Sequence, residues 1–516
     1  MSAPSTLDTP AEKSAFDRID RTAQRPAADA DVAGEVARAR RAQAIWAAKP
    51  LQERLALIRR ARQRLPMVAA EWDRLIHPQR RGPGETLGLE VVPTADAFRF
   101  LERYASKVLR PRHYGAWLRP VWLTGVVAEV HREPFGVILV IGPSNYPLFL
   151  PAVQVVQALA AGNSVVLKPG TGGGPIAQAF ADLLYGAGLD RDVLRVLSES
   201  PEAGERAIEA GVDKVLLTGS ARTGAAVLAK LAPRLIPATL ELSGCDAVFV
   251  REDANLDVVT RALRFGFRLN HGETCIAPHR VFVARPLAED LKKRLADAAE
   301  RECYEARTPA ARAAASLISD ATRRGARVLA GRILPDQQGI TPTVVTDVSC
   351  DMPLLQEDLF APVVSVVEVS NDDEALAAAA KCPYALGSTI FGGLAGAQAL
   401  AQRVHAGGVV INDMVAPTAD PRLPFGGRGR SGYGVTRGVD GLLEVTTVKV
   451  VSIRKGGADW HLDPPQANDY QFFETYLRAT NSSSFTGWLS AWCSLIPLMI
   501  QRLRGPATAP PTDSDK

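Results

Sequence analysis

Short apolar runs alternate with helical stretches through the middle of the chain. Five of these runs have the length of a β-strand, at residues 135–141, 164–168, 193–197, 214–218 and 239–242. A second alternating series extends from about Asp246 to Asp413, with helical stretches at 256–267 and 287–299. Alternation of this kind is typical of βα units and a parallel sheet. We therefore predict an α/β chain in which a Rossmann-like parallel-sheet domain precedes a second α/β domain.

Polar and small residues stand where the predicted strands end. Asn145, Lys168, Gly219 and Glu241 each fall at or just past the end of one of the five runs. In parallel α/β sheets, ligands bind beyond the carboxyl ends of the strands. We therefore expect these four positions to contribute to one binding site.

The C-terminal segment carries an apolar stretch at 485–500 that two arginines follow. A helix of this length covers about 24 Å, which is short of the roughly 30 Å of hydrocarbon in a bilayer. Pro497 is also expected to interrupt it. Trp488 and Trp492 would suit a helix at a membrane interface. Two interpretations stay open, a helix that packs on protein and peripheral membrane contact through 485–504.

Composition restricts the function further. The length of 516 residues indicates two to four domains. The hydrophobic content of 47% is sufficient for large buried cores. The net charge is only +4, without a long basic cluster beside aromatic residues, so nucleic acid is not an expected partner. Six scattered cysteines without a Cys-x-x-Cys pair argue against a metal site and a disulfide framework. Residues 1–25 are polar, and we predict a flexible lead and a cytoplasmic protein.

A thiol and a carboxylate indicate the chemistry. Cys275 lies 34 positions after Glu241. A cysteine thiolate can add to a carbonyl carbon, and a carboxylate base can activate the water that later releases the product. The amide of Asn145 could hold the oxyanion formed in the addition.

Three segments in order resemble the aldehyde dehydrogenase superfamily over roughly residues 30–455. They are Gly142-Pro143-Ser144-Asn145-Tyr146-Pro147, Glu241-Leu242-Ser243-Gly244 and Gly272-Glu273-Thr274-Cys275-Ile276-Ala277-Pro278. The resemblance implies a thiohemiacetal and then a thioester on Cys275, with the oxyanion held by Asn145 and the backbone N–H of Cys275. It also implies that Glu241 activates water, and that a small β arm joins a homodimer or homotetramer. Some fatty-aldehyde members carry a hydrophobic C-terminal extension, which favours a hydrophobic aldehyde here.

The cofactor motifs imply NAD or NADP. Thr218–Gly224 follows a predicted strand and opens a helix, where the N–H groups near Gly219, Ser220 and Gly224 would favour phosphate. By resemblance, Lys168 and the turn at Thr171 contact a ribose. Asp358 and Phe360, also by resemblance, hold the ribose and ring of the nicotinamide. The Gly-x-Gly-x-x-Gly match at 427–432 follows no predicted strand, so we do not expect it to bind phosphate.

Several residues depart from the family pattern. They are Ser144 for Trp, Thr171 and Asp358 for Glu, Glu273 for Gln and Cys245 for Lys. Without a Glu at 171, discrimination between NAD and NADP is relaxed and Arg222 could favour NADP, although we lean to NAD. A carboxylate at Glu273 could oppose the thiolate of Cys275. Weaker alternatives are a Cys/His dyad with His271 or His279 and a redox link from Cys245 to Cys275.

These inferences combine into one expected organisation. We predict a flexible N-terminus (1–25), a cofactor-binding domain (26–112 and 132–242), a catalytic domain (243–440), an oligomerisation arm (113–131 and 441–455) and a C-terminal extension (456–516). The predicted activity is oxidation of an aldehyde to its carboxylic acid with NAD or NADP. Transfer of the acyl group to coenzyme A, or a catalytically silent binding protein, are the alternatives.

Overall fold

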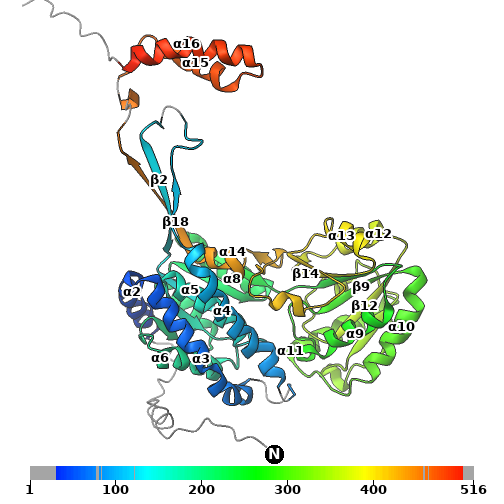
Figure 1. Cartoon of the computed structure of the whole chain (residues 1–516). Coiled ribbons are helices and arrows are strands. Elements are labelled where there is room, and N and C mark those ends of the chain that lie inside the picture. Colours follow the sequence, from blue (N-terminus) through cyan, green and yellow to red (C-terminus); the bar gives the residue numbers. More distant parts are fainter. Residues whose placement is uncertain are drawn as a thin grey trace, which may run out of the picture. The chain divides into compact units, whose positions relative to one another are not determined.

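The computed structural model describes residues 31–76, 81, 82, 84–120, 123–456, 460–462 and 464–503. The predicted flexible lead at 1–25 lies outside this part of the chain. The described chain divides into two compact units (Figure 1). The larger unit contains the described residues up to Arg110 together with Arg132–Thr447. The smaller unit contains Pro111–His131 and the described residues from Val448 onward.

Five parallel strands of the larger unit confirm the first alternating series. The sheet has the order β17-β7-β6-β3-β4-β5, and the short strand β17 (Gly432–Tyr433) runs antiparallel at its edge. Each observed strand begins and ends within two residues of its predicted bounds. The five are β3 (Val137–Ile141), β4 (Ser164–Lys168), β5 (Leu194–Val196), β6 (Lys214–Gly219) and β7 (Ala238–Leu242).

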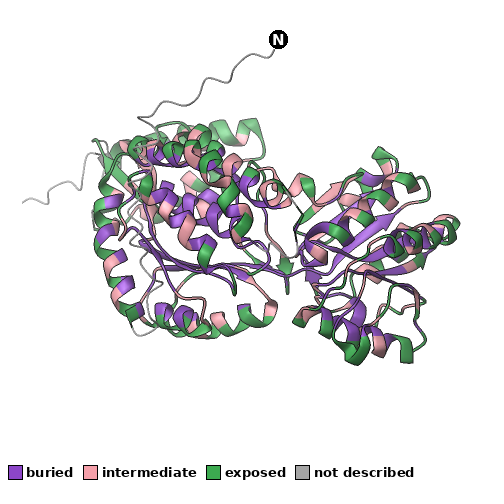
Figure 2. Cartoon of the chain, turned by 90° about the horizontal axis from the view of Figure 1, so that it is seen from below, coloured by how far each residue is buried: buried purple, intermediate pink, exposed green. Residues whose placement is uncertain are grey.

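Helices enclose this sheet because the apolar side chains of its strands must be covered on both faces. In α5 (Phe149–Ala161) every residue is buried, as expected of a helix that is apolar on all sides. The other crossover helices are α6 (Gly174–Gly186), α7 (Pro201–Glu209) and α8 (Ala221–Leu231). Figure 2 shows the buried residues concentrated in the strands and on the inner faces of the helices.

Two helices open the described chain before the first sheet. α2 (Val32–Ala48) and α3 (Leu51–Leu75) are separated at Pro50, which has extended backbone angles and precedes α3. A π-helical turn, η2 (Leu87–Val91), leads into α4 (Val92–Val108). Trp46, Ile58 and Phe98 from these helices pack in one core with α5.

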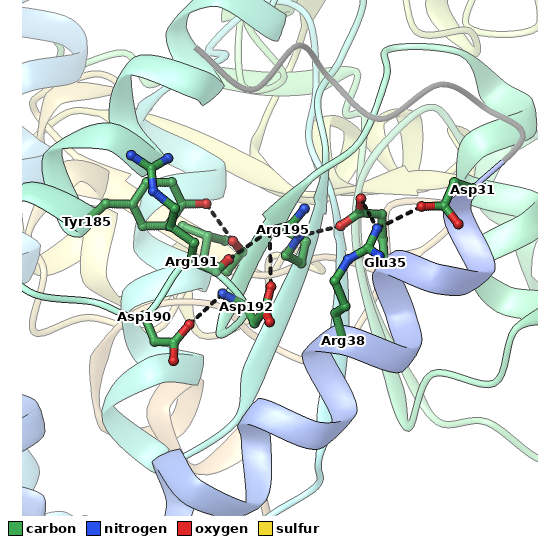
Figure 3. A network of polar contacts seen from close by, with 9 residues as sticks. Asp31, Glu35, Arg38, Tyr185, Asp190, Arg191, Asp192 and Arg195 are labelled. Atoms are coloured by element: carbon green, nitrogen blue, oxygen red, sulfur yellow. Dashed lines mark hydrogen bonds and ion pairs between the residues drawn. The ribbon is translucent and has the colours of Figure 1, made fainter. Parts of the chain in front are cut away.

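A polar network fastens α2 to strand β5 (Figure 3). The Glu35 carboxylate accepts hydrogen bonds from Arg195 of β5 and from Arg38, the latter at 2.5 Å. Burial alone would raise the pKa of Glu35, but these two guanidinium groups hold it below its ordinary value. Arg195 also pairs with Asp192 at 3.2 Å, and Arg38 with Asp31 at 2.7 Å. The nearly buried charge of Glu35 is therefore compensated on both sides.

The second alternating series forms a seven-stranded sheet in the order β10-β11-β12-β9-β8-β14-β15. Its strands are parallel except for the pairing of β10 with β11. The strands are β8 (Asp246–Val250), β9 (Pro278–Ala284), β10 (Arg327–Ala330), β11 (Thr343–Thr346), β12 (Val363–Val369), β14 (Gly387–Phe391) and β15 (Gly408–Ile411). The helices are α9 (Leu256–Arg268), α10 (Arg285–Glu300), α11 (Pro309–Arg323), α12 (Asp372–Ala379) and α13 (Leu394–Ala401). Two α/β sheets in one chain confirm the predicted fold class.

The smaller unit contains the arm segments predicted at 113–131 and at 448–455 and the described part of the C-terminal extension, whereas 441–447 belong to the larger unit. Strands β1 (Arg112–Tyr114), β2 (Val126–Pro134) and β18 (Thr446–Arg454) form a three-stranded sheet. Two helices follow, α15 (Asp469–Asn481) and α16 (Phe485–Leu503), which pack through a small core. The prediction that Pro497 interrupts the helix is wrong, because α16 continues past it. Proline removes one backbone N–H donor, but the rest of the helix is retained. None of the helices described is long and apolar enough to cross a membrane.

Candidate active site

The strand register brings the predicted polar residues to one edge of the first sheet. Ile141 at the end of β3 pairs with Lys168 at the end of β4, and Thr218 near the end of β6 pairs with Glu241 in β7. These pairs all lie at the carboxyl ends of parallel strands, as the fold rule predicts. Asn145 lies in the loop that follows β3 and is buried.

Cys275 lies in the connection between a short helical turn, η5 (Leu269–Gly272), and strand β9. Its carbonyl oxygen accepts a hydrogen bond of 3.1 Å from Gly244 N–H, just after β7. The loop that carries Cys275 is thereby fixed to the strand that carries Glu241. Burial raises the pKa of the Cys275 thiol, and Glu241, Asp246 and Asp358 raise it further. A group that stabilises the negative charge of the thiolate must therefore act on Cys275 before the thiolate can form.

Glu241 is a buried carboxyl group with one unsatisfied oxygen. Its Oε2 accepts a hydrogen bond of 3.1 Å from the Thr436 hydroxyl, while Oε1 has no partner among the described residues. Burial raises the pKa of Glu241, and Arg437 and Thr436 oppose that rise. A carboxylate with a raised pKa is a better proton acceptor than one in water, which suits a general base.

The Asn145 loop is tied to the Cys275 loop by amide groups. Asn145 Nδ2 donates to the carbonyl oxygen of Glu273 at 3.0 Å. Asn270 Nδ2 donates to the same oxygen at 3.0 Å and to the carbonyl oxygen of Asn145 at 3.2 Å. Asn270 has a left-handed backbone (φ 48°), which asparagine tolerates better than most residues. The Asn145 amide is thus held in place beside the chain that leads to Cys275.

A buried ion pair supports the loop that carries Asn145. Arg81 Nη1 lies 2.5 Å from Glu90 Oε1, and both side chains are almost completely buried. Arg81 Nη2 also donates to the carbonyl oxygen of Asn145 at 2.8 Å. Glu90 Oε2 accepts from the backbone N–H groups of Leu148 and Phe149, at the start of α5. No local motif in the sequence indicates this pair, because its two residues meet only in the fold.

The two weaker cysteine alternatives find no support in the geometry. Cys245 packs with Cys382, and a side-chain hydrogen bond with Cys382 raises the pKa of the Cys245 thiol. The Sγ atom of Cys245 also lies 3.8 Å from the carbonyl oxygen of Leu355. His271 stacks on Tyr304 with 4.2 Å between the ring centroids. The buried His279 bonds the carbonyl oxygen of Val363 at 3.1 Å, and burial lowers its pKa to about 4. These contacts account for Cys245 and for both imidazole rings without Cys275.

The phosphate-binding loop predicted at Thr218–Gly224 has the expected surroundings. Gly219 ends β6, and Ser220 is the N-cap of α8, its hydroxyl accepting from Thr223 N–H at 3.1 Å. Gly224 lies so close to β7 that a Cβ there would stand 2.8 Å from Leu242 Cδ1. The first N–H groups of a helix in this position are suitable donors to a phosphate.

The ribose-side residues lie at the same edge of the sheet. Lys168 is buried at the end of β4, and burial lowers its pKa while Glu199 and Glu202 oppose that shift. Thr171 is exposed in the turn that follows. The carboxylate of Glu199 accepts from Gly172 N–H at 2.6 Å and from Gly174 N–H at 2.7 Å. Glu199 therefore supplies a carboxylate near Lys168 that no motif in the sequence indicated.

Asp358 and Phe360 are the residues predicted at the nicotinamide end of a dinucleotide. Burial raises the pKa of Asp358 to about 6, and bonds from Ser243 and from Phe360 N–H oppose the rise. Asp358 Oδ1 is buried without a partner among the described residues, so it is free to accept from a ribose hydroxyl. Phe360 has a left-handed backbone (φ 43°). The residues present are therefore compatible with NAD or NADP.

The glycine-rich match at 427–432 makes close contacts with the strands beside it. Ser431 Oγ donates to the carbonyl oxygen of Ser243 at 2.8 Å and accepts from Ala385 N–H at 3.0 Å. A Cβ at Gly432 would stand 2.0 Å from the carbonyl oxygen of Leu240. The segment therefore ties the end of β7 to β13 (Tyr384–Ala385), which pairs with β16 (Arg428–Gly429).

Comparisons with known proteins agree with this geometry. The model of the "Aldehyde dehydrogenase family" matches residues 10–451. A protein of Mycobacterium ulcerans with the provisional name succinate-semialdehyde dehydrogenase [NADP(+)] 2 is 32% identical over 455 residues, covering 84% of this chain and 86% of that one. The 4,4'-diapolycopene aldehyde oxidase of a Methylomonas species is 30% identical over 79% of each chain. The structure of a Mycobacterium tuberculosis aldehyde dehydrogenase complexed with NAD+ superposes with a TM-score of 0.77 at 26% identity, covering 84% of this chain and 92% of that one.

Proposed function

The chain belongs to the aldehyde dehydrogenase family, and from that premise we propose that it oxidises a hydrophobic aldehyde to a carboxylic acid through Cys275, Glu241 and Asn145. It is an NAD(P)-dependent aldehyde dehydrogenase. The observation that carries the proposed residues is their convergence: a thiol, a buried carboxyl and a fixed amide come from three segments to one edge of the sheet.

Cys275 is the nucleophile in this proposal. Its Sγ adds to the aldehyde carbon and forms a thiohemiacetal, whose oxyanion accepts from Asn145 Nδ2 and from the backbone N–H of Cys275. Asn145 Nδ2 already donates one of its two hydrogens to Glu273 at 3.0 Å, which leaves the other for the oxyanion. Because the amide is held before substrate binds, it needs no reorganisation during the addition.

The cofactor supplies the oxidation. Bound NAD or NADP would supply the acceptor for the hydride that leaves the substrate carbon, and the acyl group would then remain on Cys275 as a thioester. Gly219, Ser220 and Gly224 would hold the phosphates, Lys168 and Thr171 the adenosine side, and Asp358 and Phe360 the nicotinamide side. The unsatisfied Oδ1 of Asp358 and the N-terminus of α8 support this assignment.

Glu241 completes the cycle by taking a proton from water, which then attacks the thioester. The raised pKa and the unpartnered Oε1 of Glu241 support this role. A carboxylate base at this position favours water over coenzyme A as the acceptor of the acyl group. For the same reason, hydrolysis to the carboxylic acid is preferred to the thioester-transfer alternative.

A hydrophobic aldehyde suits the side chains around Cys275. Ile276, Leu386 and Phe425 form an apolar cluster against which Cys275 packs. A second cluster, with Phe149 among its members, includes Tyr146 from the Asn145 loop. One relative is named for the aldehyde of 4,4'-diapolycopene, which agrees with an apolar substrate.

NAD is the cofactor that we favour. A 2'-phosphate beside Lys168 would meet the carboxylates of Glu199 and Glu202, both of which act electrostatically on that lysine. The uncharged hydroxyl groups of an NAD ribose would meet no such repulsion. The carboxylate that the sequence lacks at Thr171 is thus provided by another segment.

We assign the arm to a homodimer or homotetramer. Val448 and Val450 on β18 are 51% and 60% exposed, so this strand presents apolar side chains that a second copy could cover. The apolar segment 485–504 is proposed to make peripheral membrane contact from the cytoplasm. Phe485 and Trp488 on α16 are 75% and 42% exposed, which supports a partner for this surface beyond α15.

The proposed function is tested by following reduced nicotinamide with short, long-chain and aromatic aldehydes, each with NAD and with NADP. Wild-type protein should turn over a hydrophobic aldehyde, and Cys275→Ala should not. Turnover by Cys275→Ala at the wild-type rate would remove Cys275 from the chemistry. Oxidation that requires coenzyme A would replace hydrolysis by acyl transfer.

A further inference from the structure

Arg437 is a buried cation beside the proposed catalytic residues. It is 4% exposed and immediately precedes helix α14 (Gly438–Glu444). Its guanidinium carbon lies 4.3 Å from the ring centroid of Phe425 and 5.5 Å from that of Phe149. Nη1 donates to the carbonyl oxygen of Thr418, but Nε has no partner among the described residues. Buried guanidinium groups are usually paired with an anion, so this residue needs an explanation.

The backbone of Arg437 is in a conformation that side chains rarely adopt. Its φ of 64° and ψ of 170° belong to a region occupied almost only by glycine. The flanking chain enforces it: Thr436 and Phe425 exchange backbone hydrogen bonds of 2.8 and 2.7 Å, and Gly438 N–H donates to Pro421 at 3.1 Å. Strain of this kind persists where the surroundings over-determine it, which is common at functional sites.

Two neighbours of Arg437 contact the proposed catalytic side chains. Thr436, the preceding residue, donates its hydroxyl to Glu241 Oε2 at 3.1 Å. Phe425, whose ring lies against the guanidinium, packs in the cluster that includes Cys275. Arg437 is therefore held by Thr436, which bonds to the proposed base, and by Phe425, which packs near the proposed nucleophile.

The charges around Cys275 are unbalanced without Arg437. The charged or titratable groups that face the thiol are Glu241, Asp246, Asp358, Tyr146 and Arg437. Of these, only Arg437 lowers the pKa of Cys275, and it also lowers that of Glu241. In the proposed cycle Cys275 forms a thiolate at one stage and Glu241 acts as a carboxylate at another, within the same buried surroundings. Without a cation, burial disfavours each anion, and the neighbouring acidic groups disfavour the thiolate further.

We propose that Arg437 is the counter-charge shared by the Cys275 thiolate and the Glu241 carboxylate. It is a positioning residue, because it acts on the reacting groups through its charge and not by bonding to them. The inference rests on the proposed roles of Cys275 and Glu241. It also explains the strained backbone of Arg437, which holds the guanidinium group where its charge can stabilise both anions.

The test is the pH dependence of Cys275 alkylation by iodoacetamide, an uncharged reagent, followed by mass spectrometry on the full-length protein. Arg437→Met should move the midpoint of the profile to higher pH by about one unit or more, so that the rate at pH 7 falls about tenfold. Arg437→Lys should restore most of the reactivity. Arg437→Gly adopts the backbone conformation without strain, so it tests the charge even if Arg437→Met folds poorly.

The exposed Arg422, which pairs with Asp420, provides the control, and Arg422→Met should leave the profile unchanged. Folded Arg437→Met or Arg437→Gly protein with a wild-type profile would overturn the proposal. A higher KM for an anionic semialdehyde alone, with an unchanged profile, would also overturn it in favour of substrate binding. Failure of the proposed function would be seen separately, as wild-type alkylation without aldehyde oxidation.

Discussion

The side chain of Asn270 holds the backbone of Asn145, 125 residues earlier in the chain, by a 3.2 Å hydrogen bond. The same amide nitrogen donates to the carbonyl oxygen of Glu273, two residues before Cys275. Asn270 thereby fixes the distance between the loop of the proposed oxyanion donor and the loop of the proposed nucleophile. Donors placed before the reaction contribute more to catalysis than donors that must be reoriented.

Asp246 should control the reactivity of Cys275 above neutral pH. Burial raises its pKa to about 7, although Gly387 N–H donates to it at 3.1 Å. Asp246→Asn should accelerate alkylation of Cys275 at pH 8.5, where wild-type Asp246 is ionised and opposes the thiolate. At pH 5.5 wild-type Asp246 is neutral, so the two proteins should react alike.

The same substitution has a consequence for stability. Because the folded pKa of Asp246 lies above its unfolded value, its contribution is fully present below about pH 4 and is lost as the pH rises through about 7. Asp246→Asn should therefore gain melting temperature relative to wild type over that interval. Asp257→Asn, at an exposed position, serves as the control. Equal effects at pH 5.5 and 8.5 would contradict the assignment.

Glu199 should determine the choice of cofactor. Glu199→Gln removes a carboxylate near Lys168 while it keeps one acceptor for the N–H groups of Gly172 and Gly174. We expect the ratio of the two dissociation constants to shift roughly tenfold toward NADP, since one repulsive charge is lost. Calorimetric titration without aldehyde measures this, and the exposed Glu209→Gln is the control. An unchanged ratio would show that Glu199 only caps the N-terminus of α6.

The exposed face of α16 should mediate attachment to lipid. Replacing Phe485, Trp488 and Ile496 by serine removes side chains that are 75%, 42% and 51% exposed, so the fold should be retained. Wild-type protein should sediment with anionic phosphatidylglycerol vesicles, and the triple variant should stay in the supernatant. If neither sediments but the triple variant changes its oligomeric size, the surface serves another protein chain instead.

The sequence predicted the sheets and their ends better than the residues that support the site. Strand β4 was predicted at both ends because its apolar run is bounded by polar and small residues. The glycine at position 224 was found because its loop follows a strand. Arg437 and Asp246 belong to no motif in the sequence, and their effect on Cys275 depends on burial and on neighbours distant in the chain. Pro497 misled the prediction, since packing of α16 on α15 outweighs the loss of one hydrogen bond.

In the proposed mechanism, an acyl group forms on Cys275 and is released by water that Glu241 activates. Glu241→Gln keeps the size of the side chain but removes the base, so deacylation should slow by about 10² to 10⁴. Incubation of this variant with a hydrophobic aldehyde and NAD should give a single burst of reduced nicotinamide. Intact mass spectrometry should then find one acyl group, located on Cys275 and absent from the Cys275→Ala, Glu241→Gln double variant. Steady turnover at the wild-type rate, or a burst without acylated Cys275, would contradict the account.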